Sequence, residues 1–368
     1  MRVVAVLTGG PSSEHYVSRW SGERVLESLD RRRYNPIPVV IERDGTWTVR
    51  GVRKPGPLEA VAALRDEGCE AVFIALHGSF GEDGTVQGFL ETVGLPYTGS
   101  GVAGAALAMD KIRSKRLVAT LGVPVARDLI VPPTCEADVQ DALGYPVFVK
   151  DPLGGSSLEV VAAHDAAEFE AAVARLGPGC DALLVEEAIE GREVTVPVLD
   201  DEQGRPEALP VVEIRSDGDF FDFRNKYTSG VAQEIVPARI PPTVAERLQE
   251  TTLRIHRRLG LRALSRNDFI LRPDGVAVYL ESNPIPGLTP NSILPKAAAV
   301  VGLDFRDLLT RLIEGAIRWR GVHNERHGAS RAQALGRRAV DRQPGVLREE
   351  APLEEGPAVL DAPPSHQG

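Results

Sequence analysis

Short apolar runs alternate with helix-like segments in the first third of the chain, and this alternation limits the folds that the sequence can adopt. The runs cover residues 3–7, 37–41 and 71–76 and are rich in valine, isoleucine and alanine. Runs of this length fit buried strands, and strands separated by helices are typical of an open α/β sheet. We therefore expect an α/β domain over residues 1–110.

The middle of the chain predicts a smaller domain of mixed α+β structure. Strand-like segments at 147–150, 158–162 and 183–186 accompany a helical pattern at 166–176. Because such a set can form one small sheet with a helix against it, we assign residues 111–190 to this second domain.

A third domain is expected over residues 191–321. The sequence predicts a long helix at 241–259, followed by strands at 261–271 and 276–281 on either side of a Pro-Asp-Gly turn. A final helix is indicated because apolar residues recur at the spacing of one helical face. These residues are Phe305, Leu308, Leu309, Leu312, Ile313 and Ala316.

The last part of the chain has no such periodicity. Beyond residue 321 the sequence becomes Arg-rich and then rich in glutamate and proline. Segments of this composition cannot bury enough apolar surface to fold, so we expect residues 322–368 to be disordered.

The composition excludes several kinds of partner. The 368 residues are 43% apolar and 26% charged, as in ordinary soluble proteins, and the net charge is −10. This acidic balance argues against nucleic acid or anionic membranes as partners.

Cys69, Cys135 and Cys180 are too far apart to indicate a metal site or a disulfide framework, so we expect buried thiols. The first apolar run is too short for a signal peptide, and a cytoplasmic protein is predicted.

A cluster of polar residues late in the chain carries the strongest chemical signal. Arg266 and Asp268 lie on one expected strand, and Glu281 and Asn283 lie on the next. A tight turn would bring the two carboxylates close to the Asn283 amide, and such oxygen ligands suit Mg²⁺ that binds substrate phosphates. Taken alone, the cluster is more simply explained as two surface strands with scattered charges.

Two glycine-containing segments could each present backbone N–H groups to a negatively charged oxygen. Lys150 ends an expected strand and is followed by the segment 154–157, Gly-Gly-Ser-Ser, whose backbone amides could bind phosphate together with the lysine. The lysine precedes the glycines, so this is no Walker-type loop, and a flexible hairpin turn explains the segment alone more simply. Gly287 follows Pro286 and could direct its backbone N–H toward an oxyanion, or belong to a rigid loop without a chemical role.

Together these motifs resemble the ATP-grasp fold and, more closely, the D-alanine:D-alanine ligase family. The resemblance extends over residues 1–320 and is carried by the segments at 9–18, 75–78, 81–84, 97–101, 109–111, 281–283 and 286–292. It implies a multidomain α/β and α+β protein in which an N-terminal α/β domain precedes two ATP-grasp subdomains, at 111–190 and 191–321.

The resemblance also implies an activity. Two D-alanines, small amino-acid substrates, would be joined with ATP through an acyl phosphate, with two Mg²⁺ or Mn²⁺ ions, to make a peptidoglycan precursor. The enzyme would be a homodimer.

Roles for individual residues follow from the same resemblance. The residues expected to bind the two substrates are Glu14, His77, Lys226 and Ser292. Those expected to bind the nucleotide are Lys111, Lys150, Ser156, Ser157, Glu186, Glu187, Ile189, Glu193 and Lys226. The expected metal ligands are Asp268, Glu281 and Asn283. The expected catalytic groups are Arg266 and the Gly287 N–H, which would stabilise the oxyanion, and the triad of Glu14, Ser156 and Tyr227.

Plainer explanations stay open for some of these residues. His77 taken alone would be a hydrogen-bonded structural histidine, and Glu14 could cap a helix. The sequence departs from the family's usual pattern at Asp151, Glu159 and Pro284, all close to the expected phosphate site.

Three other functions compete with this interpretation. One is a related ligase that makes another dipeptide or a depsipeptide, although Tyr227 beside Lys226 resembles the branch that uses an amine as second substrate. Another is a nucleotide-binding homologue without catalysis, which would be expected to lack Arg266 or the metal ligands. A dinucleotide enzyme is disfavoured because the glycines after the first strand do not complete that fingerprint.

Overall fold

The computed structural model describes residues 1–132, 139–155, 160–216 and 232–319. Met1–Gly321 forms one compact unit. Several predictions lie outside the described residues, namely those for Cys135, Ser156, Ser157, Glu159, Lys226, Tyr227 and the segment 322–368.

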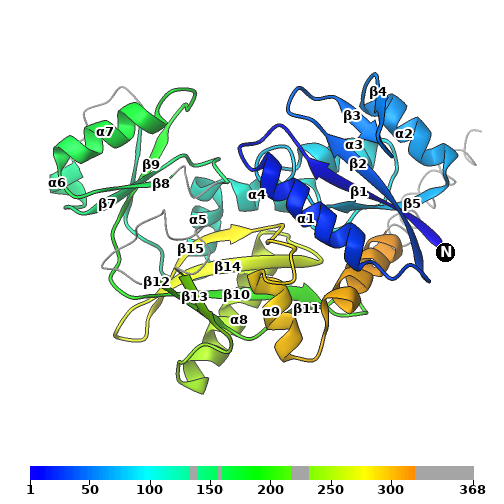
Figure 1. Ribbon diagram of the computed structural model, residues 1–368. Coiled ribbons are helices and arrows are strands. Elements are labelled where there is room, and N and C mark those ends of the chain that lie inside the picture. Colours follow the sequence, from blue (N-terminus) through cyan, green and yellow to red (C-terminus); the bar gives the residue numbers. More distant parts are fainter. Residues whose placement is uncertain (133–138, 156–159, 217–231, 320–368) are drawn as a thin grey trace, which may run out of the picture. The chain divides into compact units, whose positions relative to one another are not determined.

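The first sheet is an open sheet of five strands in the order β4-β3-β2-β1-β5 (Figure 1). Its strand β1 (Arg2–Gly9) pairs in parallel with β2 (Tyr34–Ile41) and β5 (Cys69–Ile74). Residues 4–7 of β1 are fully buried, because both faces of a parallel strand are covered. The other elements are β3 (Trp47–Val49), β4 (Val52–Lys54), α1 (His15–Ser28), α2 (Pro57–Asp66), α3 (Thr85–Thr92) and α4 (Val102–Met109). The predicted α/β fold is confirmed.

The second sheet is small and antiparallel, with the strand order β6-β9-β7-β8. Its apolar residues form a core of their own around Val149, Phe169 and Val185. The elements are α5 (Lys111–Ala119), β6 (Asp128–Val131), α6 (Val139–Ala142), β7 (Val147–Lys150), β8 (Val160–Ala163), α7 (Ala166–Leu176) and β9 (Leu183–Glu187).

The third sheet has the order β13-β12-β10-β14-β15, with β11 paired to β10. Its elements are β10 (Arg192–Asp200), β11 (Pro206–Ala208), β12 (Val212–Ser216), β13 (Ala232–Ile235), α8 (Pro242–Arg258), β14 (Leu264–Leu271), β15 (Ala277–Asn283) and α9 (Ile293–Val300). A last helix covers residues 305–319, and its predicted apolar face is buried, with Leu308, Leu309 and Ile313 fully enclosed.

The start of β14 differs from the prediction for a reason that the structure shows. The strand expected from residue 261 begins at Leu264, because Ala263 has a φ of 66°, in the left-handed region that strands do not adopt. Asp200 holds this turn: its Oδ2 accepts from the Ala263 N–H at 2.8 Å, and its own N–H donates to the Ala263 carbonyl at 2.8 Å.

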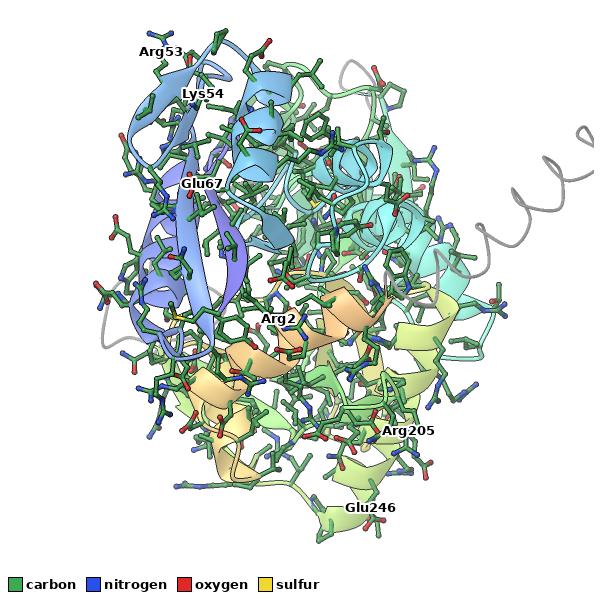
Figure 2. All side chains as sticks on the ribbon, turned by 90° about the vertical axis from the view of Figure 1, so that its right-hand side faces the viewer. Arg2, Arg53, Lys54, Glu67, Arg205 and Glu246 are labelled. Carbon is green, nitrogen blue, oxygen red and sulfur yellow. The ribbon has the colours of Figure 1, made fainter. Side chains whose placement is uncertain are left out.

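The first and third sheets share one apolar core. A single cluster joins Leu7 and Phe73 of the first sheet with Leu264 and with Leu312 of the last helix. Figure 2 shows Arg2, at the start of β1, beside this helix, and its guanidinium lies 3.6 Å from the Glu314 carboxylate.

Two expectations drawn from composition can also be compared with the structure. Cys69 and Cys180 are half-buried rather than fully buried. Of the helices in the described part of the chain, none is both long and apolar enough to cross a membrane.

Candidate active site

The hairpin of β14 and β15 gathers four polar side chains on one face. Arg266 pairs across the strands with Asn283, and Asp268 pairs with Glu281. Residues that are paired in this way present their side chains on the same side of the sheet. The register therefore brings together the four residues that the sequence singled out in this region.

Arg266 and Asp268 form a two-pronged ion pair. The Arg266 Nε donates to Asp268 Oδ1 at 2.9 Å, and Nη2 donates to Oδ2 at 2.8 Å. Burial by itself would lower the pKa of Arg266, but the carboxylates of Asp268 and Glu281 raise it well above its ordinary value. Thr195 on β10 supports the same carboxylate, since its hydroxyl donates to Asp268 Oδ1 at 2.5 Å. Sequence reasoning missed Thr195, because only the register of β10 with β14 places it there.

The donor set of this face fits a hard cation. Asp268, Glu281 and Asn283 offer carboxylate and amide oxygens, the ligands that Mg²⁺ prefers while it keeps part of its water. Both Asp268 oxygens accept from the Arg266 guanidinium, which therefore lies beside any cation that binds here. Within the described ranges no group of three or more His, Cys, Asp or Glu side chains is arranged to hold a metal, so any ion bound here needs water or substrate oxygens as further ligands.

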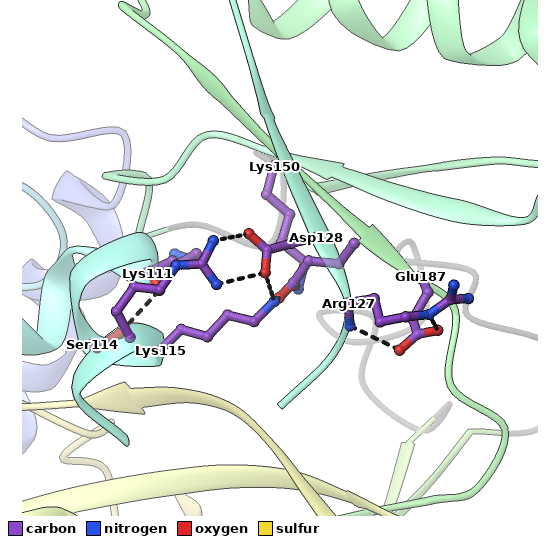
Figure 3. Close-up of polar contacts among 9 residues, drawn as sticks. Lys111, Ser114, Lys115, Arg127, Asp128, Lys150 and Glu187 are labelled. Carbon is purple, nitrogen blue, oxygen red and sulfur yellow. Dashed lines mark hydrogen bonds and ion pairs between the residues drawn. The ribbon is translucent and has the colours of Figure 1, made fainter. Parts of the chain in front are cut away.

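A buried acid on the second sheet binds two lysines. Glu186 on β9 accepts from Lys115 Nζ at 2.6 Å and from Lys150 Nζ at 2.5 Å. Figure 3 shows Lys115 reaching from α5 toward Asp128, whose carboxylate lies 3.0 Å from its Nζ. Burial would raise the pKa of Glu186, but Lys150 and Lys115 together lower it. Lys115 was not predicted, although it follows Lys111 by four residues and so lies on the same helical face.

Lys111 connects the hairpin with the glycine segment. Its ammonium group donates to the Gly154 carbonyl and lies 3.5 Å from Glu281 Oε2. The helix that carries it, α5, begins at Asp110, whose side chain accepts from the Arg113 N–H. Lys111 therefore joins two segments that stand far apart in the sequence.

The Glu14 carboxylate lies against two glycines from different domains. A Cβ atom on Gly78 would stand 3.1 Å from Glu14 Oε2, and one on Gly155 would stand 3.2 Å from it. Glu14 occupies the N-cap position of α1 but makes no side-chain capping bond. The helix-cap explanation of Glu14 is therefore wrong, and its carboxylate faces the glycine segment instead.

His77 is buried in a polar network within the first domain. Its Nε2 lies 2.9 Å from Ser21 Oγ, and its Nδ1 lies 3.6 Å from Glu82 Oε1. Burial would lower the pKa of His77, but Glu82 raises it above the ordinary value. The hydrogen bond to Ser21 is one that a structural histidine would make, and together with the nearby Glu82 carboxylate it fixes the ring in one orientation.

Gly287 and Ser292 lie together beyond β15. A Cβ atom on Gly287 would stand 2.8 Å from Ser292 Oγ, so only glycine fits here without displacing the serine. The Ser292 hydroxyl is hydrogen-bonded to the Thr289 hydroxyl at 2.8 Å. The two residues therefore form one compact turn at the start of α9.

The residues expected at the nucleotide base lie on two neighbouring strands of different sheets. Glu187 ends β9, where its carboxylate binds the Arg127 side chain, Nε to Oε2, at 2.6 Å. Ile189 follows β9, and Glu193 is the second residue of β10; both are half-buried.

A hollow of about 500 Å³ opens beside the glycine segment. Its lining includes Ser13, Gly78, Asp151 and Gly154. Asp151, one of the departures from the family pattern, turns its Oδ1 toward the Leu153 N–H at 2.9 Å and so stabilises the turn that follows β7. Pro284, another departure, is buried.

Two carboxylates on an antiparallel hairpin, Lys150 on the small four-stranded sheet and two lysines on α5 are arranged as an ATP-grasp carboxylate–amine ligase requires. Family models point to one group within this class. The model for the D-ala D-ala ligase N-terminus matches residues 3–67 and 57–100, and the model for the D-ala D-ala ligase C-terminus matches residues 124–314. The chain belongs to the D-alanine–D-alanine ligase family.

Relatives and solved structures agree with this assignment. A D-alanine–D-alanine ligase of Leptospira biflexa is 37% identical over 84% of this chain and 97% of its own length, and one of Deinococcus radiodurans is 38% identical over 86% and 98%. The D-alanine–D-alanine ligase structure from Coxiella burnetii has a TM-score of 0.77 at 27% identity, covering 91% of this chain and 99% of that one. The Bacillus anthracis enzyme complexed with ATP has a TM-score of 0.73 at 28% identity, covering 88% and 99%.

Proposed function

We infer that this protein is an ATP-dependent ligase that joins two D-alanines to D-alanyl-D-alanine, with ADP and phosphate as the other products. The first substrate's carboxylate attacks the γ-phosphate of ATP, and the amine of the second substrate then displaces phosphate from the acyl phosphate. The dipeptide is used for peptidoglycan precursors. The observation that carries this conclusion is the single face formed by Arg266, Asp268, Glu281 and Asn283 in a chain whose relatives are D-alanine–D-alanine ligases.

The nucleotide phosphates would meet lysines from two elements. Lys111 and Lys150 supply positive charge, and Glu186 holds Lys150 in place. Asp268, Glu281 and Asn283 would hold Mg²⁺, which when bound supplies positive charge to the transferring phosphoryl group. Ser156 and Ser157 would add hydroxyl and amide donors, and Glu187, Ile189 and Glu193 would contact the base and ribose.

The reacting carbonyl would lie between Arg266 and the Gly287 N–H. Both groups can donate to the oxyanion that forms when the amine attacks. The Glu14 carboxylate would bind the first substrate's ammonium group as a charge-assisted pair, and His77 would contribute a polar contact. Ser292 and Lys226 would bind the second substrate's carboxylate, and Ser156, Tyr227 and Glu14 would close the site against water, which would otherwise hydrolyse the acyl phosphate.

A related reaction is the second candidate. The VanG D-Ala:D-Ser ligase of Enterococcus faecalis is 31% identical over 85% of this chain, with a TM-score of 0.72. A mixed dipeptide would need the same site and a different pocket for the second side chain. We therefore expect D-alanine in the first position in either case.

A substrate panel separates these candidates. Phosphate release would be measured with D-alanine alone and with D-alanine plus D-serine, D-lactate or L-alanine. We expect release with D-alanine alone and the dipeptide in the product. Release with L-amino acids only would contradict the proposal, and ATP binding without D-alanine-dependent ADP formation would indicate a binding protein.

Arg266→Ala tests the oxyanion role. Loss of one such donor costs about 2.7–4 kcal/mol, so we expect kcat to fall by about 10²–10³. The matched control is Arg272→Ala at the tip of the same hairpin, where the guanidinium is half exposed and pairs with Asp274. Similar activity of the two variants would remove Arg266 from the mechanism.

We also propose that the protein acts in the cytoplasm as a homodimer. Light scattering of the purified chain tests the oligomeric state, and a monomeric mass would contradict it.

A further inference from the structure

The hidden face of the β14–β15 hairpin is polar. Asn267 pairs across the strands with Ser282, between the pairs Arg266–Asn283 and Asp268–Glu281. Because side chains alternate along a strand, Asn267 and Ser282 point away from the proposed catalytic face. Asn267 and Ser265 are fully buried, and Ser282 is 4% exposed. Polar groups at such positions are costly unless they are hydrogen-bonded.

These side chains form an unbroken chain of hydrogen bonds. Ser282 Oγ donates to Asn267 Oδ1 at 2.6 Å, so the Tyr279 hydroxyl, 2.9 Å from Ser282 Oγ, must be the donor to it. The Asn267 amide then donates from Nδ2 to Ser265 Oγ at 3.3 Å. The Asn267 side chain therefore links β15 to β14. Its amide accepts from Ser282 and donates to Ser265, so the successive hydrogen bonds have the same direction.

The hydrogen-bond network continues from β14 to α8. Ser265 Oγ lies 2.8 Å from His256 Nδ1, and since Ser265 already accepts from Asn267, it can donate its proton to a neutral imidazole. Burial lowers the pKa of His256 to about 4, which keeps the ring neutral near pH 7. Its Nε2 lies 3.9 Å from Asp200 Oδ1, beyond hydrogen-bond distance, and neither atom has a hydrogen-bond partner among the described residues. The hydrogen bonds from Tyr279 to His256 thus share one donor direction, and aligned hydrogen bonds strengthen one another.

This hydrogen-bond network joins the two strands whose opposite face carries the proposed catalytic residues. A shift of one residue in the pairing would turn Arg266 and Asp268 to the buried side, so activity requires this register. The bond between Ser282 and Asn267 joins β15 to β14 at the centre of the proposed site. An apolar pair there would fill the same space without this directional constraint.

We propose that Asn267 is a positioning residue for the ligase reaction: through Ser282 and Ser265 it holds β14 and β15 so that Arg266 and Asp268 face the same ligands as Glu281 and Asn283. This inference rests on the proposed function. It assigns Asn267 no contact with substrate, and its effect reaches the reaction only through the residues on the opposite face.

The test compares variants that remove this network with a matched control. Asn267→Leu keeps the approximate size but loses both hydrogen bonds, and Ser282→Ala is the milder variant in case the first fails to fold. The control is Thr252→Val, because Thr252 is fully buried on α8 and its hydroxyl has no partner among the described residues. Rates would be measured over a range of Mg²⁺, ATP and D-alanine concentrations.

We expect Asn267→Leu to lower kcat by about 100-fold and Ser282→Ala by about 10-fold, because displacements near 1 Å cost this much in positioned reactions. The half-saturating Mg²⁺ concentration should rise, since Asp268 and Glu281 lie on different strands. The KM for D-alanine at the first position, where Glu14 and His77 lie outside the hairpin, should stay within about 2-fold. Thr252→Val should behave as the wild type.

Lower melting temperatures with unchanged kcat and Mg²⁺ dependence would overturn the proposal, because the network would then serve stability alone. Calorimetry of Mg²⁺-dependent ATP binding tests the positioning role of Asn267 even if the proposed function is wrong. If the wild type binds Mg·ATP but makes no dipeptide, the ligase assignment fails, while weaker binding by Asn267→Leu would still support positioning. Equal binding by wild type and both network variants would refute it.

Discussion

Acid should weaken the fold through His256. The ring is buried, and its pKa falls from 6.5 to about 4 on folding. The folded chain therefore resists protonation at this site, while the unfolded chain takes up a proton as the pH falls below 6.5. The stability associated with the neutral ring is complete above pH 6.5 and is lost as the pH falls toward 4. A pKa difference of this size corresponds to about 3 kcal/mol, of which roughly 2 kcal/mol is lost by pH 5.

Urea unfolding at several pH values between 7.5 and 5 measures this effect, with tryptophan fluorescence as the signal. His256→Asn cannot take up the proton, and its amide oxygen can accept from Ser265. We expect the variant to be less stable than the wild type at pH 7.5, because it leaves a small cavity. Its free energy of unfolding should nevertheless decline less steeply with acid, so that the two curves converge by about 2 kcal/mol.

The control is His164→Asn, which changes a histidine on the surface with 62% of its side chain exposed. This variant should follow the wild type at every pH. If His256→Asn and the wild type instead lose stability in parallel, the reasoning from the buried neutral ring is refuted.

Two further changes test the site. Glu186→Gln removes the charge that holds Lys115 and Lys150, so we expect a loss of about 3–5 kcal/mol of stability and a higher KM for ATP. Unchanged thermal unfolding would show that the buried lysines find other partners. Gly287→Ala places a methyl group 2.8 Å from Ser292 Oγ. We expect kcat/KM for D-alanine to fall roughly 10-fold with little change in melting temperature. Full activity would exclude this turn from substrate binding.

The elements with regular apolar patterns could be predicted from the sequence. The last helix followed from its apolar stripe, and β1 followed from a valine-rich run that ends at Gly9 and Gly10. The start of β14 could not be predicted, because the left-handed conformation of Ala263 depends on Asp200, which is distant in the sequence. Local propensity carries no information about such a contact.

The candidate site could be predicted for one face of the hairpin only. Motifs indicated Arg266 and Asp268, but the sequence around them is polar at every position from 265 to 268. Such a run gives no sign that Ser265 and Asn267 are fully buried. Their partners come from α8 and β15, so the network becomes visible only when the register and the helix packing are known.

The distribution of apolar cores sets how the protein could be divided into exchangeable parts. The second sheet packs around its own cluster, so a chimera that replaces residues 128–187 with a relative's segment would keep all three apolar clusters whole. The first and third sheets share one cluster, and α4 approaches the loop before β14 so closely that a methyl group on Gly104 would stand 2.4 Å from the Gly260 carbonyl oxygen. These two sheets can be transplanted only as a pair, and recombination between related ligases should succeed at the borders of the second sheet and fail between the first and the third.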